Sequence, residues 1–135
     1  MATRIKLNRP NDHILKITKA HHVLNPRVVL TDVSGCAPPM TPERLAAMEV
    51  ADYGWLDNDE GEPLGLLMTL VAQPGKRLVI TVNREGLYEA SLFKQRGPAW
   101  VPLGFNSSVA PADLPGVVAA LVRAHKEYGR LRVVR

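Results

Sequence analysis

Residues 78–94, LVITVNREGLYEASLFK, contain the hairpin that decides the fold. Two runs of apolar and β-branched residues flank Arg84-Glu85-Gly86, which is typical of a three-residue hairpin loop with glycine in the left-handed position. This loop sets Leu78 opposite Leu92. A two-residue loop would set Leu78 opposite Phe93 and exchange the faces of one strand, because side chains alternate along a strand. The three-residue loop is therefore predicted.

A second turn follows at Gln95-Arg96-Gly97-Pro98. We expect a four-residue loop here, which pairs Lys94 with Ala99. The strand after this turn is predicted to end at Leu103.

This register divides the sheet into two faces. The apolar face consists of Leu78, Ile80, Ala90, Leu92, Val101 and Leu103. It would support a helix over residues 114–128, where apolar residues recur at helical spacing and Gly129 supplies the stop. The opposite, more polar face carries Phe93 and Trp100 in one row with Arg77.

The first part of the chain is predicted to add further elements. Residues 14–18 favour a strand, although Asp12 could instead cap a helix there. Residues 27–33, RVVLTDV, predict a clearer strand. Thr41 and Pro42 mark the start of a short helix, with threonine as the cap and proline at the first helical position. We expect that helix to run to about Ala51.

Together these elements predict an α+β fold in a single domain, residues 1–135. Residues 64–135 are expected to form a twisted antiparallel sheet of β-β-β-β-α order, whose first strand is the apolar run at residues 64–71. Residues 1–63 are expected to supply additional N-terminal strands, one short helix and an acidic turn at residues 57–63.

The net charge of +4 is unevenly distributed along the 135 residues. Residues 1–30 carry +5, residues 31–65 carry −7 and residues 66–135 carry +6. Such asymmetry is found in nucleic-acid-binding proteins with an acidic segment, and equally in proteins with ordinary solvated faces.

Composition also indicates a compartment. No apolar run approaches the length of about 18–20 residues that spans a bilayer, and the N-terminus lacks the apolar middle segment of a signal peptide. Cys36 is the one cysteine, so no internal disulfide can form. A cytoplasmic protein without membrane association is therefore expected.

The polar face is the candidate functional surface. Aromatic and cationic side chains on an open sheet are typical of proteins that stack unpaired bases. The alternative is that the N-terminal strands cover this face and bury Phe93 and Trp100 in a second core, since aromatic residues usually serve packing. The candidate nucleic-acid-binding residues are Lys76, Arg77, Arg84, Phe93, Lys94, Arg96 and Trp100.

The order strand, glycine-ended hairpin, strand, short loop, Trp-x-Pro and capped amphipathic helix resembles the transcriptional coactivator positive cofactor four and its bacterial relatives. These features lie in Lys76–Leu92, Trp100-Val101-Pro102 and Pro111-Ala112-Asp113-Leu114, and the resemblance covers residues 64–128. After Trp-x-Pro the family usually has a Lys-Gly-apolar step, whereas this chain keeps Gly104 and lacks the lysine.

The resemblance implies a homodimer packed through the C-terminal helix that binds single-stranded DNA on curved sheets. Carried over by position, Arg77, Lys94, Arg96 and Trp100 would contact nucleic acid. The helix residues near the dimer interface would be Val118, Leu121, Val122 and His125.

No pattern predicts a catalytic residue, a cofactor or a metal site. Asp57-x-Asp59-x-Gly61 departs from a calcium-binding loop at Glu62 and Met68. Neither a phosphate-binding nor a dinucleotide-binding glycine motif is present. Metal-ligand spacing is absent among the remaining candidates, which are His21, His22, Cys36 and His125.

The sequence thus predicts a non-enzymatic protein that binds single-stranded nucleic acid, as an accessory to transcription or replication. The alternative is a protein–protein interaction module, an assembly or inhibitor protein that uses the same sheet face. Cations beside the aromatic row favour nucleic acid, because an interaction module would show a larger apolar patch with fewer cations.

Overall fold

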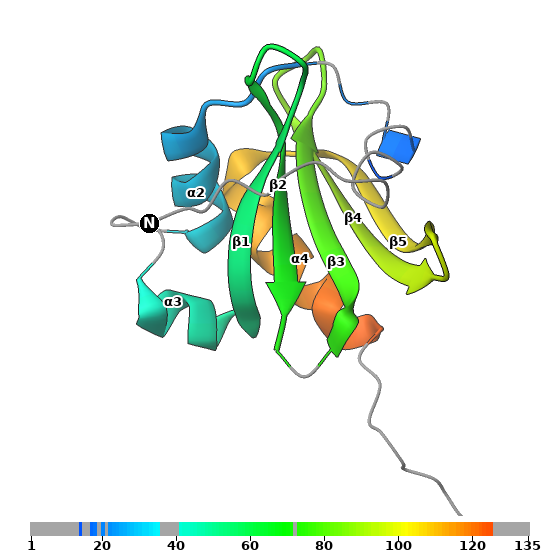
Figure 1. Ribbon diagram of the computed structural model, residues 1–135. Helices are drawn as coiled ribbons and strands as arrows, with labels where there is room; N and C mark the ends of the chain where they lie inside the picture. Colours follow the sequence, from blue (N-terminus) through cyan, green and yellow to red (C-terminus); the bar gives the residue numbers. More distant parts are fainter. Residues whose placement is uncertain are drawn as a thin grey trace, which may run out of the picture.

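The computed structural model describes residues 14, 17–18, 20, 22–35, 41–71 and 73–125. These residues form a five-stranded antiparallel sheet in the order β1-β2-β3-β4-β5, so each strand pairs with the next one along the chain (Figure 1). The strands are β1 (Val50–Asp57), β2 (Pro63–Leu70), β3 (Gln73–Val82), β4 (Tyr88–Arg96) and β5 (Ala99–Val109). The helical elements are α2 (Pro26–Ser34), α3 (Pro42–Ala47), the short 3-10 helix η1 (Pro111–Asp113) and α4 (Leu114–Ala124). The predicted α+β class is confirmed.

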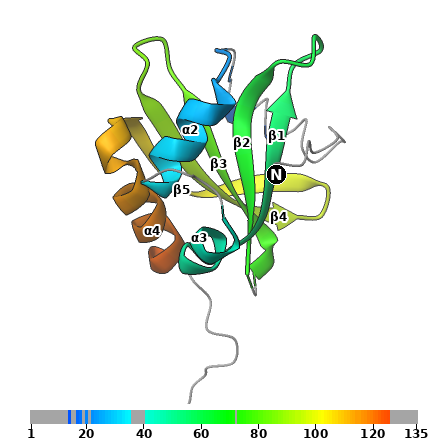
Figure 2. The same ribbon diagram turned by 90° about the vertical axis from the view of Figure 1, so that its left-hand side faces the viewer.

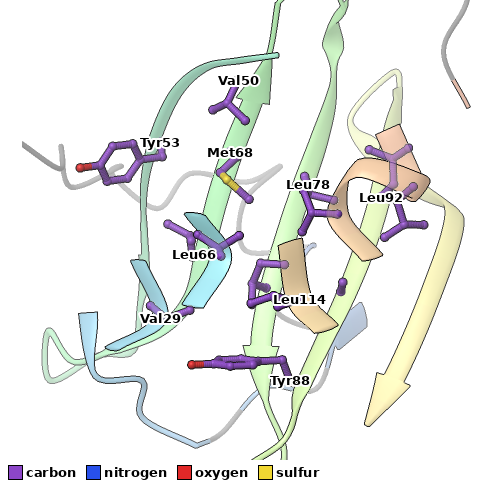
Figure 3. Packing of buried hydrophobic residues seen from close by; sticks show 14 of the residues in the cluster. Val29, Val50, Tyr53, Leu66, Met68, Leu78, Tyr88, Leu92 and Leu114 are labelled. Carbon is purple, nitrogen blue, oxygen red and sulfur yellow. The ribbon is translucent and has the colours of Figure 1, made fainter. Parts of the chain in front are cut away.

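Helices α2 and α4 lie against the same face of the sheet and enclose the main core (Figures 1 and 2). Leu66, Leu78 and Leu92 point from the strands into this core, where they meet Val29 of α2 and Leu114 of α4 (Figure 3). Each of these five side chains is at most 1% exposed. Burial of a side chain of this size contributes about 1.5–3 kcal/mol, so the contact of the two helices with this face is the main source of stability.

The predicted hairpin between β3 and β4 is confirmed. Leu78 pairs with Leu92, and Gly86 closes the loop with a φ of +82°. The Asn83 side chain holds the loop, because its Oδ1 accepts hydrogen bonds of 3.0 Å from the backbone N–H groups of Glu85 and Leu87. An asparagine that bonds its own following backbone is a standard way to stabilise such a turn.

The acidic turn between β1 and β2 has the same construction. Asn58 Oδ1 accepts hydrogen bonds of 2.9 Å from the backbone N–H groups of Glu60 and Glu62, and Gly61 has a φ of +79°. The acidic residues are therefore the exposed part of a hairpin loop whose conformation an asparagine and a glycine determine.

The turn between β4 and β5 is shorter than predicted. Arg96 pairs with Ala99, so the loop contains two residues, Gly97 and Pro98, and the expected Lys94–Ala99 pair is wrong. Gly97 has a φ of +60°, as at the first central position of a type II′ turn, whose twist matches that of the flanking strands. The shift is two residues, so Trp100 keeps its predicted face.

β5 is also longer than predicted, and a bulge changes its faces. Phe93 pairs with Pro102 but Leu92 pairs with Gly104, so Leu103 is the extra residue. The predicted pairing of Leu103 with Ala90 is wrong. The extra residue turns Gly104 toward α4 and Phe105 away from it, and a second register shift between Ala90 and Tyr88 returns Val109 to the helix-facing side.

Gly104 allows α4 to approach β5 closely. A Cβ atom built on this glycine would lie 2.8 Å from Leu121 Cδ2 and 2.9 Å from His125 Nε2. Real side chains do not come this close, so a larger residue would require the Leu121 and His125 side chains to shift. This packing accounts for the glycine after Trp-x-Pro.

The strand predicted for residues 27–33 is wrong, because this segment forms α2. Asn25 Oδ1 caps the helix by accepting a hydrogen bond of 3.1 Å from the backbone N–H of Arg27, and Pro26 takes the first helical position. Val29 and Val33 lie four residues apart and are each 1% exposed, so both reach the core from one side of a helix. Capping and tertiary burial override the strand propensity of valine here.

The strand predicted for residues 14–18 is also wrong. Ile14, Ile17 and Thr18 have helical backbone, which agrees with the alternative that Asp12 allowed. Asp12 itself lies outside the described residues.

Two other boundaries differ from the prediction. The short helix starts as predicted, since Thr41 Oγ1 accepts a hydrogen bond of 3.2 Å from the backbone N–H of Arg44, but it ends at Ala47. Glu49 then adopts a φ of +60°, which redirects the chain into β1, a strand that the sequence pattern did not indicate. The C-terminal helix is described to Ala124, and residues 126–128 of the predicted helix lie outside the described residues.

A polar contact joins α2 to the sheet. The Tyr88 hydroxyl donates a hydrogen bond of 2.6 Å to Asp32 Oδ2. Burial of the ring, followed by the hydrogen bond and charge of Asp32, raises the pKa of Tyr88 well above its ordinary value. The raised pKa means that folding favours the neutral phenol.

The neutral Tyr88 hydroxyl makes its full contribution to the free energy of unfolding below about pH 10, the ordinary pKa of a tyrosine in the unfolded chain. This contribution is lost as the pH rises above that value. We expect Tyr88→Phe to be less stable than the wild type near neutral pH and the difference to shrink toward about pH 11. Urea unfolding of both proteins across this range measures it. Tyr53 titrates in both proteins and therefore cancels in the comparison. A difference that stays constant with pH would contradict the role given to this hydrogen bond.

Candidate functional site

Phe93 and Trp100 are buried, which answers the question left open by the sequence. They are 1% and 3% exposed and form a second hydrophobic cluster with Leu56, Leu67, Val79 and Ile14. Ile17 packs against the same cluster, and the N-terminal fragment, blue in Figure 1, lies beside β4 and β5. The aromatic row is thus part of a core that the N-terminal segment covers, as the alternative interpretation expected.

Arg77 lies on the predicted face but is engaged within the chain. One guanidinium nitrogen, Nη1, donates hydrogen bonds of 2.6 Å to the Pro74 carbonyl and 2.8 Å to the Lys76 carbonyl. The guanidinium carbon stands 5.2 Å from the centre of the Trp100 ring, a cation–π contact. Burial lowers the pKa of Arg77 from its ordinary value. Arg77 therefore contacts Trp100 and the backbone of its own strand, and both contacts lie within the chain.

Lys76 lies on the helix-facing side and is 3% exposed. Its Nζ donates a hydrogen bond of 2.8 Å to Gln73 Oε1 and another to the carbonyl oxygen of His125 at the end of α4. A lysine at this position satisfies a helix carbonyl and complements the negative end of the helix dipole. Lys76 therefore anchors α4 to the sheet.

The residues proposed for a dimer contact face inward. Val118, Leu121 and Val122 are 2–6% exposed and belong to the main core, and His125 lies beside Gly104. A dimer formed through these side chains would require the core to open. Dimerisation itself stays a prediction.

The other predicted cations lie at the two ends of the sheet. Lys94 pairs with Lys76 and Val101 and so belongs to the helix-facing side, while Arg96 is exposed beside the β4–β5 turn. Arg84 is exposed in the β3–β4 loop at the opposite end. The structure does not bring these three cations together.

A groove runs over the second face of the sheet, beside the N-terminal fragment. It consists of two hollows of about 300 Å³ and 460 Å³ that share Thr18, Thr81 and Glu89 in their walls. The smaller hollow is mainly apolar, and its other lining residues are Ile17, Ser91, Phe93, Pro102 and Phe105. The larger hollow is polar, and its other lining residues are Ala20, His22, Val82, Asn83, Arg84, Glu85, Ser107 and Ser108.

Phe105 is the exposed aromatic residue of this groove. It is 57% exposed and stands opposite Ser91 across the β4–β5 ladder. The next residue on the same side, Ser107, donates a hydrogen bond of 3.3 Å to Glu89 Oε2. The sequence pattern did not predict a role for Phe105, because the predicted strand ends at Leu103 and β5 continues to Val109. The available signal was the spacing of Phe105 and Ser107, which places both side chains on one face if the strand continues.

Charge is distributed unequally between the described residues and the rest of the chain. The described residues carry eight Lys or Arg and eleven Asp or Glu, whereas the remaining positions carry nine and two. Lys16 and Lys19 belong to the second group and flank Ile17 and Thr18 in the sequence.

A separate hollow of about 390 Å³ lies between the C-terminal ends of α2 and α3 and the side of α4.

Within the described part of the chain, no three His, Cys, Asp or Glu side chains are grouped to hold a metal ion. No helix among the described residues has the length and apolarity needed to cross a membrane.

The burial of Trp100 makes a testable difference from Phe105. We expect Trp100→Ala to destabilise the protein by about 3–5 kcal/mol, because it leaves a large cavity in the second cluster. Phe105→Ala changes a mostly exposed side chain and is expected to stay within about 0.5 kcal/mol of the wild type. Urea unfolding of the two variants measures both values, and equal stabilities would contradict the burial of Trp100.

Comparisons with protein-family models, with curated proteins and with solved structures found no match to this chain.

Proposed function

We propose that this protein binds single-stranded nucleic acid in the groove on the second face of the sheet, without catalysing a reaction, as an accessory to transcription or replication. The observation that carries the proposal is the exposed ring of Phe105 at the rim of a small hollow lined by hydroxyl, carboxylate and apolar side chains. The site differs from the predicted one, since Phe93 forms the floor of the groove and Trp100 lies in the buried cluster.

An exposed aromatic ring suits an unpaired base. Every base has a π-face, and stacking on a protein aromatic contributes about 1–3 kcal/mol per base. In a duplex both faces of each base are already stacked on neighbours, so only a single strand or an extruded base can use such a ring. The hollow of about 300 Å³ is at the small end of ligand sites, which fits one base.

At the polar end of the groove, Arg84 is the cation among the described lining residues that could contact a sugar-phosphate backbone, and it lies beside the carboxylates of Glu85 and Glu89. Arg84 is exposed there, and Asn83 and Ser107 offer further polar groups. Phosphate contacts of this kind contribute a large, salt-sensitive share of the affinity and orient the strand.

The proposal predicts that Phe105→Ala weakens binding about tenfold, since it removes one stacking contact. The measurement is the fluorescence anisotropy of a labelled mixed-sequence single strand at low salt. Val101→Ala is the matched control, because Val101 is 39% exposed on the same strand but on the helix-facing side. Failure of the wild type to bind any single strand at low salt would end the proposal.

The proposal also predicts the salt dependence. Arg84→Gln should reduce the slope of log K against log salt by about 1, the value for one lost phosphate contact. Arg27→Gln removes an equal charge from α2, on the far side of the sheet, and is expected to leave the slope unchanged. Equal slopes for wild type and Arg84→Gln would remove Arg84 from the site.

A protein–protein interaction module is the second candidate. It is favoured by the two carboxylates of the groove, Glu85 and Glu89, and by the exposed ring of Phe105. A partner's apolar side chain would fill the smaller hollow, and its affinity would change little with salt. The titration above distinguishes the two candidates, because only nucleic acid requires a steep salt dependence.

A further inference from the structure

We propose that the groove recognises guanine in preference to the other bases, through the carboxylate of Glu89. This inference rests on the proposed function, because it concerns which base of a single strand the same groove accepts. The residue that carries it is Glu89, which lies in the shared wall of both hollows.

Glu89 is placed to meet the edge of a base that stacks on Phe105. Glu89 and Ser91 are two residues apart on β4, so their side chains point to the same side of the sheet at positions about 7 Å apart. Ser91 stands opposite Phe105, so the carboxylate and the ring are diagonal neighbours on one face of the sheet. A base that lies on the ring and extends along β4 would therefore present its edge to Glu89.

The Glu89 carboxylate accepts a hydrogen bond within the protein and keeps further acceptor capacity. Glu89 Oε2 accepts the 3.3 Å hydrogen bond from the Ser107 hydroxyl, and the side chain is partly exposed. Oxygens of an ionised carboxylate have about four lone-pair positions, so acceptor capacity is left for a ligand. The site thus offers hydrogen-bond acceptors, and it requires donors from the base.

Guanine is the base whose edge matches these acceptors. Its Watson–Crick edge carries two adjacent donors, N1–H and the N2 amino group, which can bond both oxygens of one carboxylate. Cytosine and adenine each place an acceptor nitrogen beside their amino group. In thymine and uracil the N3–H lies between two carbonyl oxygens, which the carboxylate would repel.

The surrounding charge supports the same orientation. Glu85 and Glu89 make this wall of the groove unfavourable for phosphate, whereas Arg84 at its polar end is favourable. A strand would therefore turn its bases toward Glu89 and its backbone outward. The Glu89 carboxylate repels a base edge that carries mainly acceptors, and it attracts an edge that carries two adjacent donors.

The test uses three labelled oligonucleotides of equal length, a thymine strand, the same strand with one central guanine and the same strand with one central inosine. Inosine lacks the N2 amino group and keeps N1–H. With the wild-type chain we expect the guanine strand to bind about tenfold more tightly than the thymine strand, the value for one bidentate contact, and the inosine strand to fall between them.

Glu89→Gln should abolish the preference for guanine, because an amide presents a single acceptor oxygen. Glu43→Gln removes the same charge from α3, which lines neither hollow, and is expected to keep the preference. Circular dichroism and urea unfolding of both variants check that the fold is intact.

The outcomes separate this inference from the proposed function. Equal binding of all three strands by the wild type, or a guanine preference that survives Glu89→Gln, overturns guanine recognition and leaves single-strand binding in place. No binding of any strand overturns both. Guanosine monophosphate as a competitor distinguishes a strand from a free nucleotide, and we expect it to displace the guanine strand only at much higher concentration, because it lacks the neighbouring phosphates.

Discussion

The loop between β3 and β4 is the constraint on which the two faces of this sheet depend. Asn83 Oδ1 bonds two backbone N–H groups of the loop, and Gly86 supplies the positive φ that closes it. A loop one residue shorter would turn Leu92 away from α4 and Phe93 toward it. Since α2 and α4 pack on one face only, this hairpin determines which side chains meet the helices and which lie under the N-terminal segment.

The core on the second face is built from two distant parts of the chain. The N-terminal segment brings Ile14 and Ile17 onto the row of Phe93 and Trp100, so an aromatic row that could have been a platform becomes a core. Arg77 then stacks on Trp100 and bonds backbone carbonyls instead of facing solvent. The groove is the part of the second face beside Ile17 and Thr18 that stays open, and the bulge at Leu103 places Phe105 at its rim.

The distribution of charge fits a groove better than an open basic surface. Lys76 bonds the end of α4, Lys94 and Arg96 lie near the β4–β5 turn at one end of the sheet, and Arg84 lies at the other end. The described walls of the groove carry one guanidinium and two carboxylates, so a bound strand could not rely on a broad positive field between them. Recognition would instead depend on a few local contacts, with a stacked base at the centre and cations at the margin.

Local signals were enough to predict the α+β class, the three-residue hairpin, the start of the short helix, and the common face of Arg77, Phe93 and Trp100. These signals are a glycine in a turn, a threonine before a proline, and the alternation of side chains along a strand. Contacts between distant segments were needed to show that residues 27–33 form a helix, that Phe93 and Trp100 are covered, and that Lys76 reaches α4. These depend on which distant segments pack together, and the burial gained there outweighs local propensities of less than about 1 kcal/mol per residue. Phe105 belongs to the second group, because its face depends on a bulge in the pairing of β5 with β4 that no local signal indicated.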